Sequence, residues 1–142
     1  MIIDHIGIVV KSLEKGIEQW TTVFGYKQMT EIVLNTRQKV KVVFMQKKGS
    51  ILIKLVEPVD KTSPAYNMAL KGGGLHHLGF KCDNLDTEIN NLQKHGLRVI
   101  TEPQPGEAFN NNMIAFLFAK HGLNIELIDT DIKAKKLYDN DD

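Results

Sequence analysis

Apolar and polar positions along the first part of the chain predict strands around a single helix. Residues 2–10 are mostly apolar and β-branched, which is typical of a strand. In residues 12–25, apolar side chains recur at helical spacing, after a serine that suits an N-cap and before a glycine that suits a helix end. Apolar runs predict three more strands, at 26–34, 40–46 and 51–56. This part of the chain therefore predicts one βαβββ unit.

The same pattern returns after a linker. Residues 57–74 carry two prolines and a run of glycines, with room for one helical turn at 65–70. A strand is predicted at 75–82, and a helix at 83–96 that begins with a capping Asp or Asn and ends at a glycine. The remaining strands are predicted at 98–101, 113–118 and 124–128.

Two segments of this second part lack a strand pattern. Residues 102–112 are rich in proline, glycine and asparagine, so we expect a long loop there. From residue 129 the chain is charged, and we expect a tail that frays after a short helical stretch near Ala134.

Short motifs indicate that the second unit repeats the first. His-Ile-Gly at 5–7 returns as His-Leu-Gly at 77–79, and Ile-Lys-Leu at 53–55 returns as Ile-Glu-Leu at 125–127. Both copies are 72 positions apart (77 minus 5 and 125 minus 53). A repeat of this length is one supersecondary unit used twice. We therefore expect an α+β fold in which two tandem βαβββ units form a curled mixed sheet around a cavity.

The repeat also sets the expected domain organisation. We expect a single domain over residues 1–130, with the first unit at 1–57 and the second at 75–129. Residues 131–142 form the charged tail.

Composition narrows the class of protein. The net charge of +1 over 142 residues argues against nucleic acid as the main partner. The first ten residues contain Asp4 and His5 and no cleavage-site pattern, so they predict neither a signal peptide nor a membrane span. We expect a cytoplasmic protein with a small-molecule substrate.

The repeated positions carry the candidate chemistry. Alternate residues of a strand face one side of a sheet, so the repeat should bring His5, Lys54, His77 and Glu126 together on the concave face. Two histidines and a carboxylate with open positions suit Zn²⁺, Co²⁺, Ni²⁺, Mn²⁺ or Fe(II). By the same alternation His76 points to the opposite face and is a poor ligand candidate.

The motifs that carry a family resemblance span most of the chain, from His5 to about Ile128. They are Asp-His-Ile-Gly-Ile-Val-Val at 4–10, Leu-Val-Glu-Pro at 55–58 with Thr-Ser-Pro at 62–64, Gly-Leu-His-His-Leu-Gly-Phe at 74–80, Ala-Phe-Leu at 115–117 and Ile-Glu-Leu at 125–127. The chain resembles the vicinal oxygen chelate superfamily of glyoxalase, bleomycin-resistance and extradiol-dioxygenase proteins, and within it the methylmalonyl-CoA epimerases. The resemblance implies paired βαβββ units, a homodimer, and metal-ligand roles for His5, His77 and Glu126.

Two positions depart from the family pattern. Lys54 stands where the family has a Gln or Glu ligand, and an ammonium has no lone pair for a metal. Either this ammonium takes the metal's place beside Glu126, or Lys54 lies aside and three ligands hold the ion. Arg37 stands where the epimerases carry a catalytic glutamate.

These features predict a divalent-metal-dependent isomerase or lyase of the glyoxalase or epimerase type, which acts on a small carbonyl or acyl-thioester substrate through an enolate. Glu126 and Lys54 are the catalytic candidates. Arg37 and Lys39 would bind an anionic part of the substrate, unless they are two solvated cations. The alternatives are a metal-free small-molecule binding module of the resistance type and an Fe(II) dioxygenase. Because of the two departures, we expect methylmalonyl-CoA epimerase activity itself to be weak or absent.

Overall fold

The computed structural model describes residues 1–138 of the chain. Its first half consists of β1 (Ile2–Val9), α1 (Leu13–Thr22), β2 (Lys27–Gln28), β3 (Val33–Asn35), β4 (Val40–Gln46) and β5 (Leu52–Pro58). Its second half consists of α2 (Tyr66–Leu70), β6 (Gly74–Lys81), α3 (Leu85–Lys94), β7 (Arg98–Gly106), the 3₁₀ turn η1 (Glu107–Phe109), β8 (Asn112–Ala119) and β9 (Leu123–Ile128).

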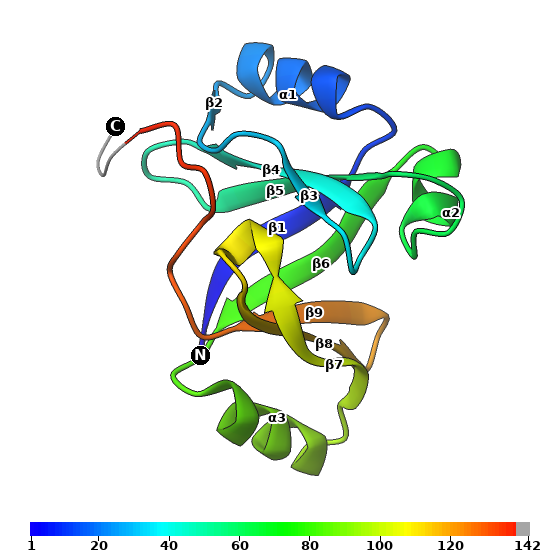
Figure 1. The fold of residues 1–142 in the computed structure, drawn as a ribbon, viewed down its shortest axis with the longest axis vertical. Coiled ribbons are helices and arrows are strands. Elements are labelled where there is room, and N and C mark those ends of the chain that lie inside the picture. The colour runs from blue at the N-terminus through cyan, green and yellow to red at the C-terminus, as the bar shows by residue number, and fades with distance from the viewer. Residues whose placement is uncertain (139–142) are drawn as a thin grey trace.

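The strands form one mixed sheet with a symmetric order. The sequence of neighbours is β2-β4-β5-β1-β6-β9-β8-β7, with β3 paired to β4. β1 is parallel to β5, β6 is parallel to β9, and β1 and β6 meet antiparallel at the centre. Figure 1 shows α1 and α3 at opposite ends of the curled sheet. The predicted α+β fold of two βαβββ units is confirmed.

Each helix covers the outer side of its own unit. Ser12 caps α1 and Asn84 caps α3, each accepting a hydrogen bond from the backbone N–H three residues on. Leu13 of α1 packs with Val43 and Leu55, while α3 buries its apolar stripe against β8 and β9. No helix within residues 1–138 is long and apolar enough to cross a bilayer.

The interior between the two units is filled by a third apolar cluster. Its largest members come from different strands and the 3₁₀ turn: Phe44, Phe109, Ile114 and Ile128. Burial of such side chains contributes about 1.5–3 kcal/mol each. The functional candidates lie against this cluster, on the inward face of the central strands.

Two expected elements differ from the structure. The predicted strand at 26–34 is two short strands, β2 and β3. The predicted loop at 102–112 is mostly strand, because β7 continues through Pro103 and Pro105 to Gly106. Proline is tolerated there because β7 is the last strand of the sheet order and needs hydrogen bonds on one side only.

The C-terminal segment forms a turn at Ala134 and Lys135, not a helix. It runs from β9 back towards β2 (Figure 1), where Glu31 N–H donates to the Lys135 carbonyl and Leu137 N–H donates to the Met29 carbonyl. The Ala134 N–H donates to the carbonyl of Ala108 at 2.8 Å. The expectation of a fraying tail is therefore wrong for residues 131–138, and residues 139–142 lie outside the described residues.

Candidate functional site

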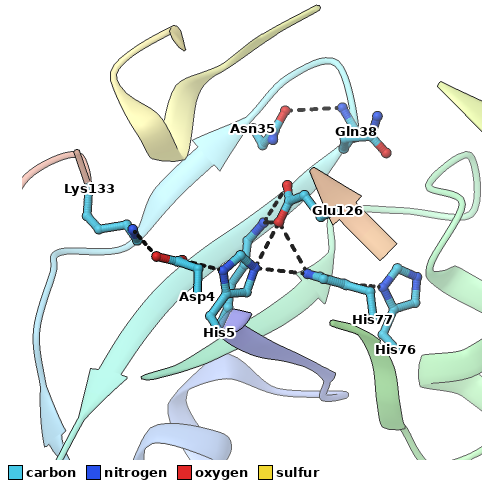
Figure 2. A network of polar contacts seen from close by, with 9 residues as sticks. Asp4, His5, Asn35, Gln38, His76, His77, Glu126 and Lys133 are labelled. Atoms are coloured by element: carbon cyan, nitrogen blue, oxygen red, sulfur yellow. Dashed lines mark hydrogen bonds and ion pairs between the residues drawn. The ribbon is translucent and has the colours of Figure 1, made fainter. Parts of the chain in front are cut away.

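The repeated positions converge at the centre of the sheet. His5 of β1 and His77 of β6 direct their Nε2 atoms towards Glu126 of β9 (Figure 2). Glu126 Oε1 lies 2.9 Å from His5 Nε2 and 3.3 Å from His77 Nε2, and the two Nε2 atoms are 3.3 Å apart. Lys54 of β5 donates from Nζ to both oxygens of Glu126, at 3.1 and 3.2 Å. All four residues are buried, and they meet as the repeat predicted.

Two glycines explain why the His-x-Gly motif occurs twice. Across the β1–β6 ladder, His5 pairs with Gly79 and His77 pairs with Gly7. A Cβ at Gly7 would overlap the His77 ring, and a Cβ at Gly79 would overlap the His5 ring. Each glycine therefore provides the space that the histidine of the other unit occupies.

A β-bulge precedes each of the two histidines. The pairing of β1 with β6 skips Asp4 on one strand and His76 on the other. Asp4 Oδ2 accepts from His5 Nδ1 at 2.7 Å, and the Nδ1 atoms of His76 and His77 lie 2.8 Å apart in a hydrogen bond. Contacts to Nδ1 orient the rings so that Nε2 faces the centre. The expectation that His76 faces away from the site is wrong, because the bulge interrupts the alternation.

Lys133 extends this network to the C-terminal segment. Its Nζ donates to Asp4 Oδ1 at 3.2 Å, and its side chain is buried (Figure 2). Burial opposes the charge of Asp4, but the hydrogen bond from His5 and the Lys133 ammonium hold the pKa of Asp4 below its usual value. Sequence reasoning missed Lys133, because nothing in a charged tail distinguishes one buried lysine from its solvated neighbours.

Burial and charge set the protonation of the central groups. Burial lowers the pKa of His77 to about 3 against the attraction of Glu126, so its imidazole is neutral near pH 7. Burial alone would raise the pKa of Glu126. The Lys54 ammonium and the hydrogen bonds from His5 and His77 outweigh burial and hold the pKa of Glu126 well below its usual range.

A narrow pocket of about 30 Å³ reaches this cluster from outside. Its lining includes Asn35, Gln38, Pro64, Lys54, His76 and His77. That volume holds a water or two, so a substrate must displace the residues at the mouth. A larger hollow of about 360 Å³ lies at the start of α3, but none of the four cluster residues lines it.

The two predicted substrate-binding cations lie beside this pocket without lining it. Arg37 is half exposed on the turn between β3 and β4, and its Nη1 is 3.7 Å from Glu107 Oε1. Lys39 is exposed and donates from Nζ to Thr62 Oγ1 at 3.1 Å. In this conformation both side chains are engaged with the protein surface.

The donor atoms fit a divalent ion only in part. Separations of 2.9–3.3 Å among His5 Nε2, His77 Nε2 and Glu126 Oε1 suit neighbouring ligands bonded at about 2.1 Å. The fourth position is filled by the Lys54 ammonium. A divalent ion 4 Å from that charge would be repelled by about 8 kcal/mol at an effective dielectric of 20. The four residues together do not fit a divalent ion while Lys54 keeps its proton.

The fold and this cluster define a class of protein. A sequence model of the Glyoxalase/Bleomycin resistance protein/Dioxygenase superfamily matches residues 4–116, and the chain belongs to this superfamily. An uncharacterized protein, YqjC of Bacillus subtilis (strain 168), is 32% identical over 128 residues, which cover 88% of this chain and 89% of YqjC.

Solved structures give the relationship within the superfamily. Methylmalonyl-CoA epimerase from Mycobacterium tuberculosis is similar with a TM-score of 0.78 and 29% identity, covering 89% of this chain and 86% of that chain. A methylmalonyl-CoA epimerase in complex with methylmalonyl-CoA and NH₄⁺ has a TM-score of 0.78 and 26% identity, covering 93% and 96%. The chain is a methylmalonyl-CoA epimerase-like member of the superfamily, an enzyme of the isomerase type.

Proposed function

We propose that this protein interconverts forms of a small carbonyl or acyl-thioester substrate by removing and returning a proton next to the carbonyl group. The observation that carries the proposal is the buried cluster of His5, His77, Glu126 and Lys54 at the end of a pocket. Methylmalonyl-CoA, held by a structural relative, is an acyl thioester with such a proton.

The reaction needs a positive charge where the enolate oxygen forms. Loss of the proton next to a carbonyl places negative charge on the carbonyl oxygen, and a fixed cation stabilises that charge. Two cations are candidates: a divalent ion on His5, His77 and Glu126, and the ammonium of Lys54. A divalent ion would act as a Lewis acid on the carbonyl oxygen. It would require Lys54 to turn away or to lose its proton.

The base in this proposal is a carboxylate of the cluster. Glu126 is ionised and does not itself line the pocket, but it contacts Lys54, which does. Its low pKa makes it a weak proton acceptor, so slow turnover is expected. Arg37, at the position of the base in the epimerases, cannot accept a proton.

Solvent deuterium exchange tests the proposal. We expect one deuterium to enter at least one member of a panel of acyl-CoA thioesters, detected by mass spectrometry, and exchange to be lost in Glu126→Gln. The exposed Lys48→Gln serves as the control and should exchange like the wild type. Absence of exchange with every thioester and small carbonyl compound would contradict the proposal.

A metal-free binding module is the second candidate. The observation that supports it is the presence of Lys54 at the position of a metal ligand and of Arg37 at the position of the base. In that case ligands would raise the melting temperature without being changed. An Fe(II) dioxygenase using His5, His77 and Glu126 would instead consume oxygen with its substrate, which an oxygen electrode would detect.

A further inference from the structure

Lys54 occupies the position that faces Glu126 across the two units. The two residues are equivalent in the repeat, Lys54 on β5 and Glu126 on β9, and their strands flank the central pair β1 and β6. The Nζ atom contacts both carboxylate oxygens, at 3.1 and 3.2 Å, and the Lys54 side chain is 4% exposed. A buried ammonium held by both oxygens of one carboxylate is an ion pair built into the fold.

We infer that Lys54 is a built-in substitute for the divalent ion: its ammonium excludes the ion from the cluster and stabilises the enolate oxygen itself. The catalytic half of this inference rests on the proposed function. The half that concerns metal exclusion stands on the contacts of Lys54 alone.

Both carboxylates of the cluster are paired with an ammonium, without a metal. Glu126 carries one negative charge and Lys54 one positive charge, and the two groups form a buried ion pair. Next to them, the charge of Asp4 is matched by Lys133. A divalent ion would add two positive charges beside the buried Lys54 ammonium, and this is costly.

One N–H of Lys54 is available for a substrate. An ammonium has three N–H donors, and among residues 1–138 the Nζ atom donates only to the two oxygens of Glu126. Lys54 also lines the pocket, with His76 and His77. The third N–H can therefore donate to a carbonyl oxygen that enters the pocket.

Removal and return of the proton next to the carbonyl need no further reagent. The carbon next to the carbonyl gives its proton to a base, and the electron pair of that C–H bond becomes the C=C bond of the enolate. The carbonyl oxygen takes the negative charge and accepts the Lys54 hydrogen bond. Return of a proton to the carbon regenerates the carbonyl, and Lys54 forms no covalent bond.

Two substitutions of Lys54 distinguish the effect of losing its positive charge from the effect of gaining a metal ligand. Lys54→Gln introduces a neutral amide oxygen of the kind that ligates metals, and Lys54→Met keeps an unbranched side chain with neither charge nor oxygen ligand. Binding of CoCl₂ to the full chain is measured by calorimetry and by elemental analysis after dialysis. We expect the wild type to retain no cobalt, Lys54→Met to bind it through the three remaining ligands, and Lys54→Gln to bind it most tightly, at least about 100-fold more tightly than the wild type. Circular dichroism and the melting temperature check that each variant is folded.

Deuterium exchange with an accepted acyl thioester tests the catalytic half. We expect exchange by the wild type to be unchanged by EDTA, to fall about 10²–10³-fold in Lys54→Met with EDTA present, and in Lys54→Gln to become EDTA-sensitive. Stoichiometric cobalt in the wild type overturns metal exclusion, and exchange that is unchanged in a folded Lys54→Met with EDTA present overturns the role of the ammonium. If no thioester exchanges in any variant, the proposed function fails together with the catalytic half, while cobalt binding still decides metal exclusion.

Discussion

At the scale of single residues, the site depends on two glycines, whose lack of a side chain leaves room for the histidine rings. The rings of His5 and His77 lie directly over Gly79 and Gly7 of the neighbouring strand. Close packing of this kind leaves no room for a methyl group. The repeat in the sequence predicted which four polar residues meet, but the reason for the glycines needed the strand register.

Substitution of Gly79 by alanine should therefore disrupt the site. The new Cβ would overlap the His5 ring, and relief requires a shift of the ring or of β6. We expect a loss of about 1–3 kcal/mol in the free energy of unfolding. Urea denaturation measures it. Gly16→Ala in α1 is the control, because its Cβ would lie 3.1–3.4 Å from the Val10 and Leu55 side chains, without the overlap found at Gly79; equal loss in both variants would contradict the steric account.

Acid should destabilise the protein through His77. Its pKa is about 3 in the folded state and 6.5 ordinarily, so between these values the unfolded chain binds a proton that the folded protein does not. Stability therefore falls as the pH falls from 6.5. Asp4 and Glu126, with lowered pKa values, act in the same direction at lower pH. At pH 5 the His77 contribution is at most about 2 kcal/mol.

Denaturant titrations at pH 7 and pH 5 measure this loss. In His77→Gln the loss on acidification should be smaller, because the glutamine does not titrate. His95→Gln, at the exposed end of α3, is the control and should keep the wild-type loss. An identical loss in all three proteins would show that His77 is not responsible.

At the scale of elements, the strand and helix pattern predicted the order of the units but not the two bulges. A bulge adds one residue to a strand without changing its apolar character, so the alternation rule placed His76 on the wrong face. The prolines of β7 led to the wrong expectation of a loop, because proline is excluded from a central strand but accepted in an edge strand. The C-terminal segment could not be predicted, because its docking depends on contacts with Met29, Glu31 and Ala108 that are distant in sequence.

The C-terminal segment should contribute to stability through Lys133. Replacing Lys133 by methionine removes one of the two partners of Asp4, whose carboxylate is mostly buried. We expect a loss of about 1–3 kcal/mol in urea denaturation. Lys135→Met, an exposed lysine two residues on, is the matched control with little expected change. The domain boundary at residue 130 stays a prediction, and a chain ending there should lose at least as much as Lys133→Met.

At the scale of the whole molecule, the strand order and the site share one symmetry. Both units present their first strand at the centre and their last strand beside it, so the four repeated residues meet at one place. A repeat in the sequence is sufficient to predict this convergence. It cannot predict how wide the pocket is, because the pocket mouth is made by the turn between β3 and β4 and by the linker, which lie outside the repeated motifs.

The protein is expected to be a homodimer. The sheet ends in two edge strands, β2 and β7, and exposed edges are commonly covered by a partner. Light scattering at micromolar concentration should give about twice the chain mass of 16.0 kDa. A mass equal to that of a single chain would contradict the expectation.

Methylmalonyl-CoA epimerase activity should be weak or absent, because Arg37 stands at the position of the base and Lys54 at that of a metal ligand. Loss of a general base typically costs about 10²–10⁴-fold in rate. Deuterium exchange into methylmalonyl-CoA should therefore be weak in the wild type and appear in the double variant Arg37→Glu/Lys54→Gln supplied with Co²⁺. Lys39→Glu/Lys54→Gln is the matched control, with the same charge change two positions away. Robust exchange by the wild type would contradict the prediction and point to another residue as the base.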